Sequence, residues 1–211
     1  MTGRTLPFAC DCGAVAGEVA AKGLAEGRHY VCHCTDCQAF AHYCGHAELV
    51  LDRNAGTDIL QLPATSVRLA RGQGELAAIH LTEGPLVRWY CAACRTPIAN
   101  TLASPKWSFF SMIMASADAE DAAAPTPPAR HVFVQSGCGD LSGAPRASMV
   151  RMGLPILKWI VKARLRGSFR SHPMFDPETL APLAEPRRLT EEERDTVYRQ
   201  ASDYRERLVP G

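Results

Sequence analysis

The chain has 211 residues, of which 46% are hydrophobic and 21% charged, and its formal net charge is +1. This balance is typical of a soluble globular protein that is long enough to bury a full core. The N-terminus lacks the basic stretch and apolar run of a signal peptide, and no segment approaches the ~20 apolar residues of a membrane span. We therefore expect neither a secreted nor a membrane-spanning protein, and predict a cytoplasmic one.

The charge is unevenly distributed along the chain. Residues 1–145 carry 10 Lys and Arg against 13 Asp and Glu, a balance of −3, whereas residues 146–211 carry 13 against 9, a balance of +4. We therefore predict two parts: a first domain at 1–145 and a basic, largely helical C-terminal extension at 146–211.

The first part has the pattern of β structure. Short runs rich in Val, Ile, Thr and aromatic residues alternate with turn-forming residues, and the glycines at 71–75 and 82–86 suit hairpin connections. The spacing predicts antiparallel strands in a small sandwich or folded-over sheet. The Ala-, Asp- and Pro-rich stretch at 117–129 is expected to be a loop. The predicted strands are 28–32, 66–70, 75–81, 86–91, 97–102, 107–115 and 131–135.

From residue 146 onward the pattern becomes helical. A segment that mixes apolar and basic residues follows, in which Pro155 is expected to start or kink any helix. A second helix is predicted over 190–208, because Thr190 and Glu193 have the spacing of a capping box. One apolar stripe along that helix should dock on the domain. It consists of Val197, Ala201, Tyr204 and Leu208.

Nine cysteines give the clearest chemical signal. In a reducing compartment, clustered cysteines bind metal or do chemistry more often than they form disulfides. A Cys-x-Cys pair in a strand points both sulfurs to one face, and Cys-x-x-Cys at a tight turn brings two thiolates to one metal, for which zinc is the expected ion. Seven of the cysteines form three clusters: Cys10 and Cys12; Cys32, Cys34 and Cys37; Cys91 and Cys94.

Seven sulfurs divide naturally into four and three. Four protein ligands close a structural zinc site, whereas three leave a position for an exchangeable ligand. We assign the two separate pairs, Cys10/Cys12 and Cys91/Cys94, to a closed structural site whose loss should unfold the domain. The triplet Cys32/Cys34/Cys37 then forms a second, catalytic site, so two zinc ions per chain are expected. A single four-cysteine zinc with three spare thiols, or cysteines that are merely buried, are the alternatives.

The remaining candidates near the cysteines are weaker. Cys138 is a lone loop thiol for which no role is predicted. Cys44, or one of its neighbours His42 and His46, could complete the triplet's metal site. His33 alternates with the cysteines of the triplet and should therefore face away from the metal.

The three motifs "ACDCG", "VCHCTDCQ" and "RWYCAACRTPI" resemble those of the glutathione-dependent formaldehyde-activating enzyme family, which includes centromere protein V. The resemblance covers roughly residues 5–140 and implies a mainly β, Mss4-like domain, a folded β-sheet stapled by zinc (a β-tent). It also implies the same two zinc sites, structural and catalytic. The chain departs from the family where Arg95 replaces the usual glycine after Cys-x-x-Cys, and the helical extension lies outside the resemblance.

A three-thiolate zinc with one open position could bind and deprotonate a substrate thiol. We therefore expect a carbon–sulfur lyase type of enzyme, in which a small thiol such as glutathione adds to an aldehyde such as formaldehyde. Glutathione is anionic, so a basic partner is expected. The candidates are Arg88, Arg95, Lys158 and Lys162.

Two other functions stay open at this point. Residues 146–175 contain seven basic and no acidic residues, with aromatic residues between them. The chain could therefore be a zinc-stabilised module that binds nucleic acid or an anionic membrane surface, although a solvated helix face or a cover over the catalytic zinc is preferred. A third possibility is redox sensing, with release of zinc from the oxidised triplet.

Overall fold

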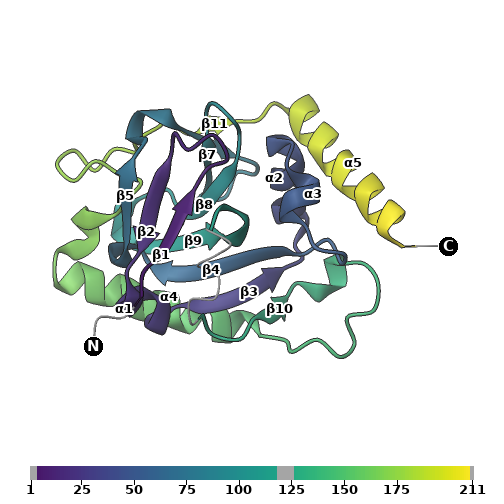
Figure 1. Cartoon of the computed structure of the whole chain (residues 1–211), viewed down its shortest axis with the longest axis horizontal. Coiled ribbons are helices and arrows are strands. Elements are labelled where there is room, and N and C mark those ends of the chain that lie inside the picture. Colours follow the sequence, from purple (N-terminus) through teal and green to yellow (C-terminus); the bar gives the residue numbers. More distant parts are fainter. Residues whose placement is uncertain (1–3, 118–125, 210–211) are drawn as a thin grey trace.

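The computed structural model describes residues 4–117 and 126–209 and contains two sheets (Figure 1). The smaller sheet is antiparallel and has the strand order β1–β2–β5. The larger sheet is open and mixed, because its two edge strands pair in parallel with their neighbours while the central strands pair antiparallel. Its order is β10–β3–β4–β9–β8–β7–β6–β11. The structure confirms the prediction of a β-rich fold with a helical C-terminal part.

The strands have the following bounds. The small sheet contains β1 (Leu6–Ala9), β2 (Ala16–Val19) and β5 (Val67–Arg71). The large sheet contains β3 (Arg28–Cys32), β4 (Thr57–Pro63), β6 (Leu76–His80), β7 (Leu86–Cys91), β8 (Pro97–Leu102), β9 (Phe109–Ile113), β10 (Arg130–Val132) and β11 (Arg187–Arg188).

The strand predictions were accurate where β-branched and aromatic residues alternate, and incomplete elsewhere. The bounds of β3, β7 and β8 match the prediction, whereas β10 is shorter than the predicted 131–135. The prediction missed β1, β2 and the central strand β4. β4 is buried on both faces, so it lacks the alternation that marks a half-exposed strand. The loop predicted at 117–129 falls mostly outside the described residues.

Two hydrophobic cores lie on the two faces of the large sheet. One joins the large sheet to the small sheet and contains Phe8, Trp89 and Phe110, each at most 1% exposed. The other joins the sheet to helices and contains Phe40, Ile79 and Ile113. Strand β7 contributes to both cores, because successive side chains of a strand point to opposite faces.

Three short helices follow the first strands: α1 (Ala21–Glu26), α2 (Thr35–Cys44) and α3 (Ala47–Val50). The last helix, α5 (Glu191–Leu208), begins with the predicted capping box between Thr190 and Glu193. Its predicted apolar stripe is confirmed: Val197 and Tyr204 are buried in the second core, Leu208 packs against that core, and Ala201 is buried. In Figure 1, α5 lies alongside α2.

Helix α4 (Met149–Leu165) runs through Pro155, which therefore does not start it. Ser148 caps the start of the helix instead, and its side chain accepts a hydrogen bond from the Arg151 N–H. Its buried side chains are Trp159, Ile160 and Ala163. No helix among the described residues is long and apolar enough to cross a bilayer.

The segment between α4 and α5 returns to the first core. Phe175 packs edge-on against Trp89, and the His172 ring packs edge-on against Phe175. The His172 Nε2 donates to the Phe109 carbonyl at 3.2 Å, and its Nδ1 accepts from the Met174 N–H at 3.3 Å. Both ring nitrogens are thus satisfied in the neutral form.

His172 makes folding stability pH-dependent. Burial lowers the pKa of His172 to about 4, although its bond to the Phe109 carbonyl acts in the opposite direction. In the unfolded chain the His172 imidazole takes up a proton below about pH 6.5, whereas in the folded chain it does so only near pH 4. Lowering the pH from about 6.5 to about 4 therefore favours the unfolded state and reduces the free energy of unfolding by up to about 3 kcal/mol. Urea unfolding at about pH 7 and about pH 5 should show a smaller loss for His172→Gln than for the wild type. Equal losses in the two proteins would contradict the assignment.

Candidate metal centres

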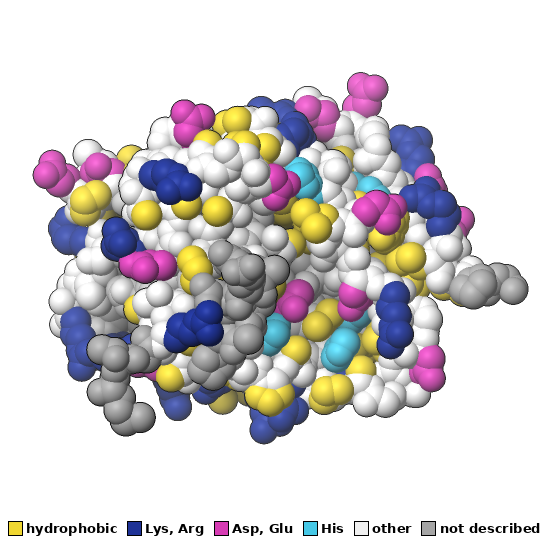
Figure 2. Space-filling model, in the orientation of Figure 1, with side chains coloured by type: hydrophobic (Ala, Val, Ile, Leu, Met, Phe, Trp, Pro, Cys, Tyr) yellow, Lys and Arg dark blue, Asp and Glu magenta, His cyan; other side chains and the backbone are white. Residues whose placement is uncertain are grey.

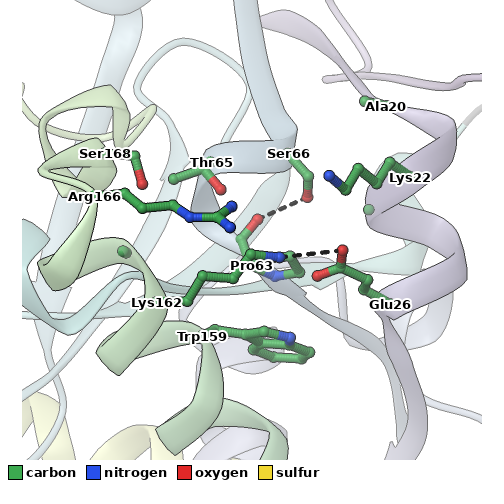
Figure 3. A pocket seen from close by; sticks show the side chains of 12 residues that line it. Ala20, Lys22, Glu26, Pro63, Thr65, Ser66, Trp159, Lys162, Arg166 and Ser168 are labelled. Atoms are coloured by element: carbon green, nitrogen blue, oxygen red, sulfur yellow. Dashed lines mark hydrogen bonds and ion pairs between the residues drawn. The ribbon is translucent and has the colours of Figure 1, made fainter.

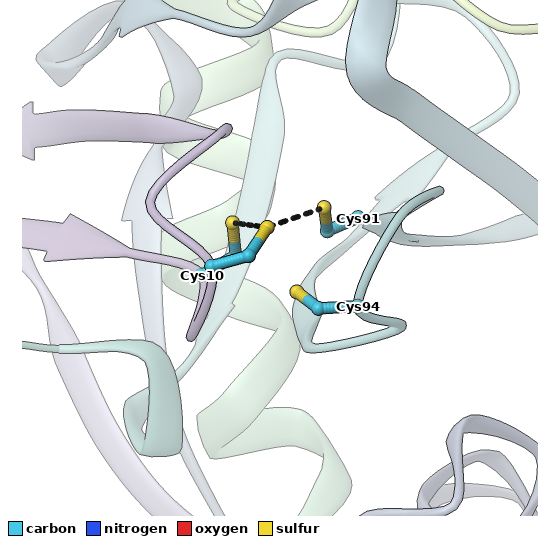
Figure 4. Close-up of side chains that lie close together, drawn as sticks. Cys10, Cys91 and Cys94 are labelled. Carbon is cyan, nitrogen blue, oxygen red and sulfur yellow. Dashed lines mark hydrogen bonds between the residues drawn. The ribbon is translucent and has the colours of Figure 1, made fainter.

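The first cysteine cluster joins two turns that are distant in the sequence (Figure 4). Cys10 and Cys12 lie in the turn between β1 and β2, which closes through a hydrogen bond from the Cys10 N–H to the Val15 carbonyl at 2.9 Å. Cys91 ends β7, and Cys94 lies in the turn that follows. The expectation that the Cys-x-Cys pair lies in a strand was wrong. The turn itself, not the pleat of a strand, brings the two sulfurs together.

The geometry of this first cluster fits a tetrahedral metal ion. The four sulfurs lie within 4.8 Å of one another, with 3.5 Å between Cys10 and Cys12 and 3.8 Å between Cys12 and Cys91. A tetrahedral zinc with bonds of about 2.3 Å holds its sulfurs about 3.8 Å apart. The donor set therefore matches a closed, four-thiolate site.

Nearby polar groups contact two sulfurs of the first cluster, those of Cys10 and Cys94. The Val15 N–H donates to the Cys10 sulfur at 3.2 Å. Burial works against ionisation of Cys94, but hydrogen bonds from the Thr96 hydroxyl and backbone outweigh it and lower the pKa of Cys94 to about 6. His46 lies at the edge of this cluster, where its Nε2 donates to the Cys94 carbonyl at 3.0 Å. These bonds orient the turns that carry the sulfurs.

Arg95, directly after Cys94, adopts a left-handed backbone conformation with φ of 63°. This conformation favours glycine, because a Cβ crowds the neighbouring carbonyl. The Arg95 guanidinium compensates by stacking over the Tyr43 ring at 4.5 Å and donating to the Tyr43 carbonyl. Stacking on an aromatic face contributes about 0.5–1 kcal/mol at an exposed site.

The second cluster is built around the start of α2. Cys32 ends β3, Cys34 is the residue before the first turn of α2, and Cys37 lies within that turn. The three sulfurs lie within 4.8 Å of one another, and those of Cys32 and Cys34 are 3.4 Å apart. This spacing also fits one metal ion. Cys32 and Cys37 are buried, whereas Cys34 is half-buried.

Among the described residues, no fourth cysteine, histidine or carboxylate lies within 4.8 Å of all three sulfurs of this second cluster. Cys44 is buried in the second core, where burial raises its pKa. His42 packs edge-on against Tyr204, and His46 lies beside the first cluster. The prediction that Cys44, His42 or His46 supplies a fourth ligand to the metal site of the triplet was therefore wrong. His33 faces away as expected, with its ring nitrogens bonded to the Asn54 carbonyl and to His131.

A buried arginine lies against the triplet. Arg88, only 2% exposed, points a guanidinium nitrogen at the Cys37 sulfur, 3.5 Å away. The same nitrogen donates to the Asn100 side chain at 3.2 Å, and the other faces the Asp36 carboxylate at 3.8 Å. A buried charge is costly unless it is paired, so the sulfurs and the carboxylate hold Arg88 in place.

Hydrogen bonds among the three sulfurs, aided by the charge of Arg88, decide which sulfur of the triplet ionises first. Hydrogen bonds from Cys32 and Cys34 lower the pKa of Cys37 well below its usual value, and the charge of Arg88 adds to the effect. A hydrogen bond with Cys32 favours ionisation of Cys34, but the Cys37 sulfur and burial outweigh it and raise the pKa of Cys34 to about 12. Of these thiols, Cys37 is therefore the one that ionises most readily.

Helix α5 covers α2 next to the triplet. The Tyr198 hydroxyl donates to the Asp36 carboxylate, and the Arg205 guanidinium donates to the Gln38 side chain. Gln38 is itself buried and donates to the His33 carbonyl at 2.8 Å. Two side chains of α5 thus bond residues that directly flank Cys37.

The structure brings together all seven predicted cysteines in the predicted grouping and leaves Cys138 outside both clusters. Of the four basic residues considered as partners for a thiol, Arg88 contacts the triplet, whereas Arg95 stacks on Tyr43. Sequence reasoning missed Asp36, Asn100 and Tyr198. Thr96 could have been found from its position two residues after Cys94, but no local signal connects Tyr198 with Asp36.

The fold and the two cysteine clusters define a β-rich protein with two candidate metal centres. The chain belongs to a family of unknown function, DUF6151, whose model matches residues 2–185. That match includes both clusters and α4 and ends before α5. A search of curated proteins found no match. A crystal structure of a Rhodobacter sphaeroides protein from structural genomics is similar at 18% identity and a TM-score of 0.39, covering 60% of this chain and 99% of that one.

The number of zinc ions bound per chain should distinguish the two candidate metal centres. We expect two zinc ions in the wild type, one in Cys34→Ser, and loss of folding in Cys91→Ser, because an ion in the four-sulfur site would supply folding free energy. A chelator should remove the three-sulfur ion first. Metal analysis combined with circular dichroism measures both effects, and Cys138→Ser is the matched control that should keep both ions. A folded Cys91→Ser protein with one zinc would contradict the structural role.

The left-handed conformation of Arg95 can be tested separately. Arg95→Ala keeps the backbone strain and loses the stacking, whereas Arg95→Gly relieves the strain and loses the same stacking. We expect the glycine variant to be more stable than the alanine variant by about 1 kcal/mol. Denaturant unfolding of the zinc-loaded proteins measures the difference. An alanine variant as stable as the glycine variant would show that the strain is absent in solution.

Proposed function

We propose that this protein is a zinc enzyme of the carbon–sulfur lyase type, in which the triplet Cys32, Cys34 and Cys37 holds the ion that binds a small external thiol such as glutathione. The supporting observation is the contrast between the clusters: four sulfurs at the first and three at the second, among the described residues. Three protein ligands are typical of catalytic zinc and four of structural zinc. We propose further that the chain is related to the formaldehyde-activating family, whose motifs it resembles, and that it shares the Mss4-like fold of that family.

Zinc is the ion we propose for both sites, because soft thiolate donors in tetrahedral spacing suit it. When bound at the triplet, zinc would supply a Lewis-acidic centre beside which a substrate thiol loses its proton near neutral pH. Three thiolates exceed the charge of a divalent ion by one. The Arg88 guanidinium, 3.5 Å from the Cys37 sulfur, offsets that excess inside a buried site.

The residues around the triplet position it and limit access. Arg88 is held between Asn100 and Asp36, and Asp36 is held in turn by the Tyr198 hydroxyl of α5. Cys34 is the half-buried member, so an external thiol would approach from its side. Helix α5, bonded to Asp36 and Gln38 on either side of Cys37, would act as a cover that keeps bulk water from that part of the site.

The reaction we propose is the reversible addition of a thiol to a small aldehyde. The sulfur forms a bond to the carbonyl carbon, the carbon–oxygen double bond becomes single, and the thiol proton ends on the new hydroxyl oxygen. No redox step is needed. In the reverse direction the carbon–sulfur bond breaks and the same proton returns to sulfur.

Nuclear magnetic resonance can follow the formation of the glutathione–formaldehyde adduct with the zinc-loaded protein as catalyst. Because Cys34 supplies one of three ligands and the exposed edge of the site, Cys34→Ser should lower the catalysed rate at least about 100-fold, within the range for losing a catalytic group. The matched control, Cys138→Ser, removes a thiol outside both clusters and should retain the wild-type rate. A wild-type rate no faster than that of Cys34→Ser would refute the proposal.

A further inference from the structure

Helix α4 is apolar on two opposite faces. One face is buried and contains Trp159, Ile160 and Ala163. The other is exposed and forms a stripe along the whole helix, with spacings of three and four residues that place its members on one side. The exposed stripe consists of Val150 (71% exposed), Leu154 (54%), Leu157 (56%), Val161 (47%) and Leu165 (82%).

Exposed large apolar side chains are concentrated on α4 in the described part of the chain. Of the nine exposed large hydrophobic side chains among the described residues, six belong to α4. Single exposed apolar side chains need no explanation, but a contiguous stripe rimmed by charge marks an interaction surface. The 17 residues of α4 extend the stripe over about 25 Å.

The charged residues that flank the stripe are all basic. Arg151, Lys158 and Lys162 lie along one side and Arg164 along the other, following the helical period of 100° per residue. Arg164 stacks over the ring of the exposed Trp107 at 4.8 Å, which adds an aromatic side chain to this rim. Figure 2 shows dark blue and yellow side chains next to one another along the lower edge of the molecule, where α4 lies in Figure 1.

A cationic cavity opens beside the stripe, between α4 and strands β3 and β10. Its volume is about 730 Å³, and Leu154 of the stripe is part of its wall. Tyr30, only 2% exposed, lines it. Burial raises the pKa of Tyr30, and three surrounding arginines oppose that shift. The cations that line the cavity are Arg28, Arg130, Arg151 and Lys158.

The described part of the chain supplies three of these cations with no acidic partner. Within residues 4–117 and 126–209, no carboxylate pairs with Arg130, Arg151 or Lys158. The acidic residue of the cavity wall, Glu26, is directed at Lys162, 3.5 Å away, across a second cavity of about 300 Å³ (Figure 3). The first cavity therefore has positive charge to offer an anionic group.

We propose that α4 binds an anionic phospholipid surface, with the stripe from Val150 to Leu165 at the headgroup–acyl boundary and a lipid phosphate in the cavity lined by Arg130, Arg151 and Lys158. An amphipathic helix with an apolar face and a basic rim lies in the plane of such an interface. The cations add electrostatic attraction to acidic headgroups, about fivefold in affinity for each Lys or Arg.

Charge and chemistry favour lipid over the other occupants. A second copy of the chain in a twofold contact would place basic rim against basic rim. Single-stranded nucleic acid stacks its bases on aromatic side chains, whereas this stripe is aliphatic. In Figure 1, α4 lies at the lower left and α5 at the upper right, so a bilayer on α4 leaves α5 and the neighbouring triplet uncovered.

The test uses the zinc-loaded full chain in co-sedimentation with vesicles of phosphatidylcholine alone and of phosphatidylcholine mixed with phosphatidylserine. We expect binding to the mixed vesicles only, weakened by salt. The double variant Leu157→Gln/Val161→Gln should lower the partition coefficient at least about tenfold. Arg151→Gln/Lys158→Gln should lower it roughly 10- to 30-fold. The matched control is Leu49→Gln, which changes an exposed leucine of similar exposure (58%) on α3 and should bind like the wild type.

Three results would overturn the proposal. The first is binding to both kinds of vesicle alike, or to neither. The second is a dimer in light scattering that Leu157→Gln/Val161→Gln converts to a monomer, which would assign the stripe to a second copy. The third is salt-dependent binding of nucleic acid that Arg151→Gln/Lys158→Gln abolishes while Leu157→Gln/Val161→Gln leaves it unchanged. All variants alter exposed side chains, and circular dichroism confirms that they fold.

Discussion

The convergence of four sulfurs from two distant turns is the constraint on which the rest of the structure depends. The sulfurs of Cys12 and Cys91 are 79 residues apart in the chain and 3.8 Å apart in space. Their cluster ties the β1–β2 hairpin of the small sheet to the end of β7 in the large sheet. The first hydrophobic core lies between the two sheets, so a metal ion at this point would act together with apolar burial to close it.

Strand β7 connects this first cysteine cluster to the second one. Its side chains alternate between the faces of the sheet, so Trp89 and Cys91 belong to the first core, whereas Tyr90 belongs to the second. Arg88 points to the same face as Tyr90 and reaches Cys37 on α2. Folding of one strand therefore places a cysteine of the first cluster and the counter-charge of the second on opposite faces of the sheet.

The second centre combines a buried charge with a covering helix. Arg88 would be costly to bury alone, but the Cys37 sulfur, the Asp36 carboxylate and the Asn100 amide surround it. The α5 side chains that bond Asp36 and Gln38 come from beyond the region matched by the family model. The cysteines and Arg88 thus lie within the region shared with the family, and the cover over them lies outside it.

The sequence by itself determined the local features. Alternation of β-branched and aromatic residues predicted β3, β7 and β8, the Thr190–Glu193 spacing predicted the cap of α5, and the spacing of the cysteines predicted their grouping into four and three. These features depend on interactions between residues a few positions apart. Strand β4 could not be predicted, because burial on both faces removes the alternation that marks a strand.

Only the tertiary structure decided which distant groups meet. It placed Arg88 rather than Arg95 at the triplet, directed His46 to the first cluster, and set Tyr198 on Asp36 across 162 residues of sequence. It also left one apolar face of α4 exposed, where the composition shows only a mixture of apolar and basic residues. Packing of whole sheets and helices selects these neighbours, and no short stretch of sequence contains that information.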